Sequence, residues 1–386
     1  MHYLLTLDFP PPYNIGERVL ASNIAKVLSR IPLSNLTILC RANHTSDYNL
    51  VYVQRTGNEY VDSARIAIRF KKICEEGEYA IVHLININYS VALPIIKALM
   101  KTHLSLIIYF YLLEHYSYLN GFKKILKCLV APRFCSNFAD IAIGTSPLIV
   151  RYLSMLGFKQ IRYIPPPVDC DLFKPINKLK AQQVLSSKFN MNIKEDSFIL
   201  LYMGHLTPTR FPYASIMKAI KETIRDGISI QFLIFAPRFW YNEVHARKIR
   251  ILSEFMNLKE HVNIHIQDID ETEKPFIYNA ADVFLFPALK PTAIDPPLTV
   301  LEAMACGLPV VASNIQSVPY IIKSGKNGFL LRDISYLKNV LRNLNQDQLQ
   351  LRKMSEKARE MIIRDFSFDS IKQRLIDLYR YIAGTF

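Results

Sequence analysis

The stretch from Pro296 to Ser313 constrains the fold of this chain most, because it encodes a loop, a helix, a helix cap and a strand in succession. Two prolines end the preceding segment, and the second can occupy the first helical position, where its missing N–H costs nothing. The run from Leu298 to Cys306 is rich in helix formers. Gly307 suits the left-handed position after a helix, and Pro309 prevents the helix from resuming. Residues 310–312 then predict a short buried strand.

The N-terminal end of this helix predicts a site for a nucleoside diphosphate. The free backbone N–H groups of its first turn, at Leu298 and Thr299, can bind an anion such as phosphate. Glu302 lies about one turn further along the helix. Its carboxylate can accept hydrogen bonds from two vicinal hydroxyls, such as those of a ribose.

Strand and helix patterns alternate along both halves of the chain, which predicts parallel, doubly wound sheets. The pattern is interrupted by a polar, Lys-rich segment at residues 177–196, which we interpret as a helix and linker. A chain of 386 residues is too long for one typical core. We therefore expect an α/β protein with two Rossmann-like domains, at residues 1–176 and 197–365, facing each other across a cleft.

The stretch around Glu302 also resembles the donor-site signature of the retaining family-4 glycosyltransferases of the GT-B fold. That signature has two glutamates, the second followed by Ala-Met-Ala-x-Gly-x-Pro-Val-Val-Ala. By this resemblance Glu302 is the second glutamate, which holds the ribose of the donor. Ile294 stands at the position of the first glutamate. Asp295, one place later, either takes over the catalytic role of that glutamate or the role is lost.

The loop after the strand at residues 198–203 resembles the Gly-Arg-Leu-x-x-x-Lys-Gly loop of the same family, whose cations grip the donor diphosphate. Gly204 matches the glycine, His205 replaces the arginine and Arg210 replaces the lysine. A cation is useful here because negative charge builds on the leaving phosphate as the glycosidic bond breaks. A neutral His205 still donates one hydrogen bond, and a bound diphosphate would favour its protonated form.

The first domain offers weaker matches to the family. Gly16 is the one glycine left of a Gly-rich loop that approaches the donor phosphate or the acceptor. The histidine that the family carries near its acceptor pocket has two possible counterparts, Tyr111 by strand length and His115 by residue type, and we favour His115 as a catalytic candidate. The resemblance further implies that the final helix, residues 366–386, crosses back to the first domain.

The resemblance implies a retaining transfer of a sugar from a nucleotide-diphosphate donor to a hydroxyl of a glycan or lipid-linked glycan. The leaving diphosphate would help to deprotonate the acceptor, and neither a metal nor a cofactor is expected. One alternative is a catalytically impaired homologue that serves as a partner or scaffold, because Ile294, His205 and Tyr320 depart from the family pattern. Another is a GT-B sugar-nucleotide epimerase.

The charge of the chain bears on its partners. The net charge is +14, yet no nucleic-acid-binding module is evident, so we expect no nucleic acid partner. Lys123, Lys124 and Lys127 cluster beside an apolar helical stripe, which is typical of contact with an anionic membrane. No apolar run reaches the ~18 residues of a membrane span, and no leader sequence is evident. We therefore expect a cytoplasmic protein, peripheral on the inner face of the membrane.

Overall fold

The chain divides into two compact units. The computed structural model describes residues 2–6, 16–31, 36–40, 49–52, 61, 64–65, 68–69, 72, 81–85, 105–110, 130, 133, 135–194, 196–292 and 294–384. Unit 1 comprises Met1–Pro167, Ala293–Asp295 and Phe368–Phe386, and unit 2 comprises Val168–Thr292 and Pro296–Ser367.

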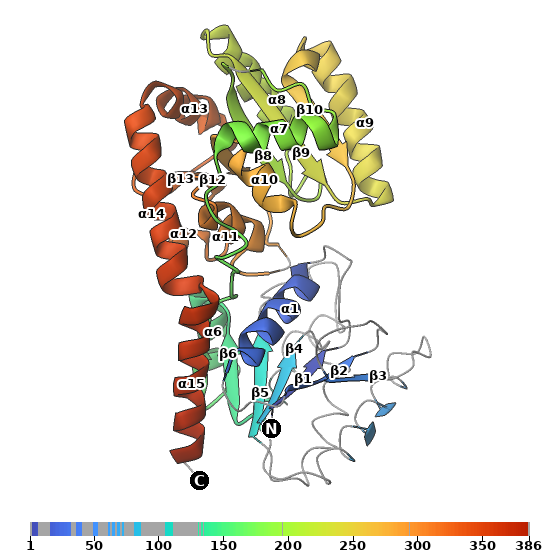
Figure 1. The fold of residues 1–386 in the computed structure, drawn as a ribbon, viewed down its shortest axis with the longest axis vertical. Helices are drawn as coiled ribbons and strands as arrows, with labels where there is room; N and C mark the ends of the chain where they lie inside the picture. Colours follow the sequence, from blue (N-terminus) through green and yellow to red (C-terminus); the bar gives the residue numbers. More distant parts are fainter. Residues whose placement is uncertain are drawn as a thin grey trace. The chain divides into compact units, whose positions relative to one another are not determined.

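Within the described residues of unit 1, seven strands form one sheet in the order β3-β2-β1-β4-β5-β6-β7 (Figure 1). The strands are β1 (His2–Thr6), β2 (Leu36–Cys40), β3 (Asn49–Tyr52), β4 (Ile81–Ile85), β5 (Ser105–Phe110), β6 (Ile141–Gly144) and β7 (Ile161–Tyr163). All neighbouring pairs are parallel. The chain runs from β1 outward to β3 and returns past β1 to β4, which is the doubly wound order.

Three helices of unit 1 are described over their full length: α1 (Gly16–Ser29), α6 (Pro147–Met155) and α15 (Phe368–Gly384). α1 buries Leu20, Ile24 and Leu28, whose spacing places them on one face of the helix. α15 packs against α1. The C-terminal segment of the chain is therefore part of the first unit.

A buried polar contact fixes α15 to the sheet of unit 1. His83 of β4 is fully buried between two tyrosine hydroxyls. Its Nδ1 lies 3.1 Å from Tyr109 Oη of β5, and its Nε2 lies 2.6 Å from Tyr379 Oη of α15. Burying an imidazole costs free energy unless its nitrogens are hydrogen-bonded. This arrangement therefore favours one position of α15 on the sheet.

The described residues of unit 2 form a second parallel sheet, in the order β10-β9-β8-β11-β12-β13. Its strands are β8 (Phe198–Met203), β9 (Ile230–Ala236), β10 (Val262–Ile266), β11 (Val283–Phe286), β12 (Val310–Ser313) and β13 (Gly328–Leu331). The strand order reverses between β8 and β11. In open α/β sheets, ligands bind beside the carboxyl ends of the strands at such a reversal. The two parallel sheets confirm the predicted α/β class.

Helices flank this second sheet (Figure 1). They are α7 (Lys178–Phe189), α8 (Tyr213–Arg225), α9 (Trp240–Phe255), α10 (Lys274–Asn279), α11 (Leu298–Ala305), α12 (Val318–Ile321), α13 (Leu337–Gln346) and α14 (Gln348–Phe366), with short 3-10 turns at Lys259–His261 and Ile334–Tyr336. α11 is buried at almost every position. None of the helices in the described part of the chain has the length and hydropathy that a membrane span requires.

The segment at residues 177–196, interpreted from sequence as a helix and linker, contains the helix α7. Asn177 caps this helix by accepting a hydrogen bond from the Lys180 N–H. Ala181, Leu185 and Phe189 are buried, and α7 packs against α10 inside unit 2. The many lysines conceal this narrow apolar face. The chain instead passes from unit 1 to unit 2 after Pro167.

Candidate functional site

The loop after β8 is shaped by close backbone packing. A side chain at Gly204 would place its Cβ 2.9 Å from Oη of the buried Tyr202, so the packing favours glycine. The Tyr202 hydroxyl donates a hydrogen bond to the carbonyl of His205 (2.6 Å), and the Gly204 N–H donates to the carbonyl of Phe235 (2.9 Å). These contacts fix the backbone that carries His205.

The imidazole of His205 is held in one orientation by α9. Its Nδ1 lies 3.0 Å from Tyr241 Oη and 3.3 Å from Asn242 Nδ2. The Asn242 amide is oriented because its Oδ1 accepts from the Leu206 N–H and its Nδ2 donates to the Pro237 carbonyl. An amide nitrogen donates only, so Nδ1 of His205 accepts and its ring proton is assigned to Nε2. Nε2–H is then available to a ligand.

His205 is neutral in the folded chain at physiological pH. Burial, with a further contribution from the charge of Arg210, lowers its pKa from 6.5 to about 4. The neutral form is the one that the sequence analysis expects to donate a single hydrogen bond. The protonated form, expected beside a bound diphosphate, stays a prediction.

This pKa shift predicts a specific loss of stability in acid. Between pH 6.5 and pH 4 the unfolded chain binds more protons at His205 than the folded chain, so the free energy of unfolding falls as the pH falls through that range. When the pH falls from about 7 to about 4.5, the free energy of unfolding of His205→Asn should fall by about 2 kcal/mol less than that of the parent. Urea unfolding at a series of pH values measures this difference. Parallel stability curves for the two proteins would contradict it.

Arg210 lies in the turn that precedes α8. Its charge lowers the pKa of His205 and opposes the burial that raises the pKa of Tyr241, so the guanidinium is close to both rings. Within the described part of the chain, no group accepts a hydrogen bond from this guanidinium. Its donors are therefore available for an anionic ligand.

The N-terminal end of α11 provides a second set of donors. Pro297 is the residue before the helix and gives no side-chain cap. The N–H groups of Leu298 and Thr299 precede the first helical hydrogen bonds and have no acceptor among the described residues. Leu298 is buried and Thr299 half-buried, so these N–H groups are unsatisfied donors at the helix end where the sequence predicts an anion site.

Glu302 is buried one turn into α11 and already has two partners from α10. Its Oε2 accepts a hydrogen bond from Tyr278 Oη (2.8 Å), and its Oε1 lies 3.7 Å from Nζ of Lys274, which is also buried. Burial raises the pKa of the Glu302 carboxyl, and the Lys274 charge opposes this effect. Each carboxylate oxygen has two lone pairs, so the group can still accept ribose hydroxyls.

Lys274 and Tyr278 are site residues that sequence reasoning missed. No motif marks them, because α10 meets α11 only through the tertiary fold. Nearby, the Asp270 carboxylate accepts hydrogen bonds from both the N–H and the hydroxyl of Thr272.

Asp295 is fully buried and belongs to unit 1, at the carboxyl end of β6. The Ser146 hydroxyl donates a hydrogen bond to its carboxylate (2.6 Å), and the Thr145 hydroxyl donates to its carbonyl (2.7 Å). Ser146 Oγ also caps α6 by accepting from the Ile149 N–H. The Asp295 carboxylate therefore anchors its own segment, a contact that the sequence analysis did not anticipate.

The other predicted site residues are described in part or not at all. Gly16 is the first residue of α1, and the loop before it lies outside the described residues. His115 and its alternative Tyr111 also lie outside them. The same holds for the proposed membrane-contact residues: Lys123, Lys124 and Lys127.

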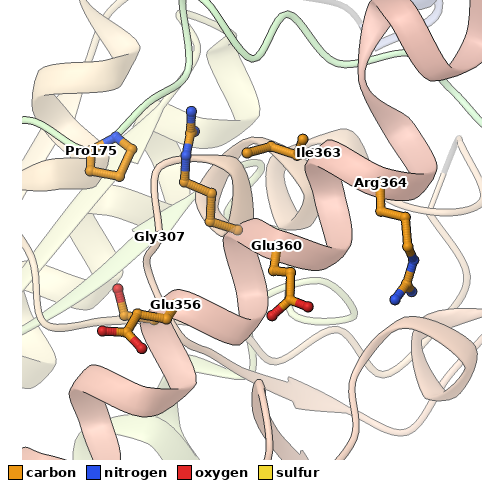
Figure 2. Close-up of a pocket in the computed structure, with 8 residues that line it drawn as sticks. Pro175, Gly307, Glu356, Glu360, Ile363 and Arg364 are labelled. Atoms are coloured by element: carbon orange, nitrogen blue, oxygen red, sulfur yellow. The ribbon is translucent and has the colours of Figure 1, made fainter.

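A separate pocket of about 810 Å³ opens beside α14. Figure 2 shows Glu356, Glu360 and Arg364 projecting from this helix. The pocket reaches Gly307, which follows the C-terminal end of α11, so it lies at the opposite end of that helix from Leu298. Its acidic and basic side chains alternate, and we assign no ligand to it.

Comparison with protein families and curated proteins gives matches over part of the chain. Residues 185–361 match the family model described as glycosyl transferases group 1. The UDP-Gal:alpha-D-GlcNAc-diphosphoundecaprenol alpha-1,3-galactosyltransferase of Escherichia coli is 31% identical over 229 residues, which cover 57% of this chain and 54% of that protein. A putative colanic acid biosynthesis glycosyltransferase, WcaL of Salmonella typhimurium, is 26% identical. The match covers 47% of this chain and 45% of that protein. The chain spans about half the length of the curated relatives it matches.

Comparison with solved structures gives matches over the whole chain. Sucrose-phosphate synthase from Thermosynechococcus elongatus aligns with a TM-score of 0.77 and 18% identity, over 100% of this chain and 99% of that one. Anabaena HepE in complex with UDP aligns with a TM-score of 0.78 and 15% identity, over 98% of this chain and 99% of that one. At these identities the likeness shows a common fold.

Proposed function

Residues 185–361 form a domain of the glycosyl transferases group 1 family in a chain of GT-B fold, and we propose that the chain is a retaining glycosyltransferase. It moves a sugar from a nucleoside diphosphate sugar to a hydroxyl of a lipid-linked glycan. The observation that carries the proposal is the group of unused donors in unit 2. The N–H groups of Leu298 and Thr299 and the Arg210 guanidinium lack acceptors among the described residues.

These groups have complementary roles toward a donor molecule. The helix N–H groups and Arg210 bind the diphosphate, and Nε2–H of His205 adds a neutral hydrogen bond. Glu302 accepts the ribose hydroxyls, while the charge of Lys274 opposes the rise in the carboxyl pKa that burial causes. We propose UDP as the nucleotide. The Escherichia coli relative is named for a UDP-Gal donor, and Anabaena HepE was solved in complex with UDP and with UDP-glucose, which supports this choice.

The proposed reaction keeps the configuration of the sugar. The bond between the anomeric carbon and the diphosphate oxygen breaks, and the acceptor oxygen bonds to the same face of that carbon. The acceptor proton passes to the departing diphosphate, so no protein nucleophile is needed. The negative charge on the diphosphate grows in this step, and fixed donors aimed at it stabilise the transition state. We propose that Arg210 and the α11 N–H groups perform this work without a metal ion.

The acceptor is proposed to enter beside unit 1, with His115 as a catalytic candidate. The Escherichia coli relative is named for an acceptor in which a sugar is joined through diphosphate to undecaprenol. A lipid-linked acceptor also agrees with the expectation of a cytoplasmic protein that binds the inner face of an anionic membrane.

An impaired homologue remains the second candidate, and one observation favours it. Ile294 is buried where the family has its first glutamate, and the neighbouring Asp295 carboxylate already accepts a hydrogen bond from Ser146. Such a protein would bind a nucleotide sugar without transferring the sugar.

Nucleotide-dependent thermal stabilisation tests the proposed donor site. A ligand that binds only the folded state raises the melting temperature, by an amount set by its concentration relative to Kd. We expect UDP to stabilise the protein more than UMP, because the second phosphate reaches Arg210 and α11. Equal melting temperatures with UDP, UMP, GDP, ADP and no nucleotide would contradict the proposal.

A further inference from the structure

α9 carries a row of large apolar side chains on its solvent-facing side. Trp240, Val244, Ile251 and Phe255, which we name the α9 stripe, are 78%, 40%, 67% and 85% exposed. With 3.6 residues per helical turn, the four positions fall within about 60° of one another around the helix. They share one side of the helix, as an apolar pair at each end of it: Trp240 with Val244, and Ile251 with Phe255.

The α9 stripe lies opposite the side by which α9 packs on unit 2. The buried positions of the helix are Asn242, Ala246, Ile249 and Ser253, and the helix contacts α8 and β10. Figure 1 shows α9 along an edge of unit 2. A helix packed on a sheet normally has polar residues at the positions farthest from its buried face. Several large apolar residues sharing that side mark an interaction surface.

Cations flank the α9 stripe. Arg247 and Lys248 are exposed at its centre, between Val244 and Ile251, and Arg250 is exposed beside them. Two glutamates also lie near the stripe: Glu243 is half-buried, and Oε1 of Glu254 lies 3.3 Å from Nζ of Lys259. The three cations outnumber them. An exposed apolar stripe with a basic border is typical of a helix that lies in the surface of an anionic bilayer. Tryptophan at one end also suits the boundary between headgroups and acyl chains.

We propose that the α9 stripe docks unit 2 on an anionic lipid surface. The apolar side chains enter the outer acyl region, while Arg247, Lys248 and Arg250 meet the phosphate groups of the lipid. This surface is distinct from the helix predicted around Lys123, Lys124 and Lys127, and it does not depend on the proposed activity. Where the acceptor is lipid-linked, docking concentrates the enzyme at the surface that holds it.

Charge argues against a second copy of the chain as the occupant. A two-fold interface is self-complementary, so each residue of one copy meets a fixed residue of the other. The antiparallel pairing that matches Trp240 with Phe255 and Val244 with Ile251 also places Arg247 of each copy opposite Lys248 of the other. Those like charges repel each other, whereas an anionic bilayer attracts them.

The composition of the chain supplies a local probe of this docking. Trp240 is the single tryptophan, so emission excited where tyrosine does not absorb reports on one end of the α9 stripe. We expect a blue shift when the protein is titrated with phosphatidylglycerol vesicles and none with phosphatidylcholine vesicles. The shift should weaken at high salt, because the Debye length falls to about 3 Å at 1 M. Vesicle binding with unchanged Trp240 emission, or no binding, would overturn the proposal.

Variants that keep Trp240 measure the two contributions separately. We expect Ile251→Ser with Phe255→Ser to weaken binding to anionic vesicles by at least about 100-fold, since burying each side chain is worth about tenfold or more. Arg247→Glu with Lys248→Glu should weaken it by about 25-fold or more, at about fivefold for each cation. All four positions are exposed, so the variants should melt at the temperature of the parent.

Matched controls remove exposed leucines of unit 2 outside α9. Leu179→Ser on α7 and Leu349→Ser on α14 should bind vesicles as the parent does. Equal loss of binding in these controls, or parent-like binding by the α9 variants, would refute the α9 stripe as the docking surface. Sedimentation velocity without lipid tests whether a second copy of the chain binds the α9 stripe. Self-association of the parent that Ile251→Ser with Phe255→Ser abolishes would assign the stripe to a contact between copies instead.

Discussion

Arg210→Met is expected to lower kcat for sugar transfer by about 10²- to 10³-fold, the usual effect of removing one preorganised donor from a developing negative charge. Arg210 is suited to this role because no described group accepts a hydrogen bond from its guanidinium and because His205 beside it is neutral. Its loss leaves no side-chain cation at this position in the loop. KM for the donor should change less than kcat, since the charge on the diphosphate is greatest in the transition state.

Two further variants control this measurement. Arg210→Lys keeps the positive charge but cannot form the bidentate hydrogen bonds of a guanidinium, so it should retain only part of the activity. Arg225→Met removes an exposed arginine from the last turn of α8 and should leave kcat unchanged. Parent-like turnover by Arg210→Met would exclude this guanidinium from the chemical step.

Glu302→Gln is expected to weaken UDP binding by about 30- to 1000-fold, or about 2–4 kcal/mol, because hydrogen bonds from two ribose hydroxyls to a carboxylate are stronger than those to a neutral amide. Isothermal titration calorimetry with UDP measures the change. The substitution also leaves Lys274 buried beside a neutral group. Breaking one member of a buried ion pair typically costs about 3–5 kcal/mol of stability.

A double variant separates the binding role of Glu302 from its structural role. Glu302→Gln with Lys274→Met removes both buried charges, so the free energy of unfolding should return toward that of the parent. UDP affinity should stay low, because the carboxylate is still missing. If affinity recovers together with stability, Glu302 supports the fold and does not hold the ribose.

The fold class and the helix at α11 could be predicted because their signals are local. Pro297, Gly307 and Pro309 mark the ends of α11, and the structure places the helix at Leu298–Ala305. The helix predicted within residues 177–196 is α7, but its place inside unit 2 could not be predicted, because the lysines conceal the apolar face that packs against α10.

The environment of the site could not be predicted because it depends on distant parts of the chain. Asp295 meets Ser146 across 149 positions of sequence, and Glu302 meets Tyr278 of α10 across 24. Neither spacing is a motif. The residue types at Glu302 and Arg210 suggest their chemistry, whereas the neutral state of His205 follows from burial and a nearby charge that only the folded chain supplies.

The most direct test of the proposed activity is sugar transfer from UDP-hexoses to a hexosamine-diphosphate lipid, followed by NMR of the product. We predict that the parent forms a new glycosidic bond whose anomeric configuration is that of the donor. In Arg210→Met, the rate of product formation should fall by the same factor as kcat. Inversion at the anomeric carbon would contradict the retaining reaction. Tight UDP binding with neither transfer nor donor hydrolysis, over the full set of UDP-hexoses, would contradict the enzyme and favour the impaired homologue.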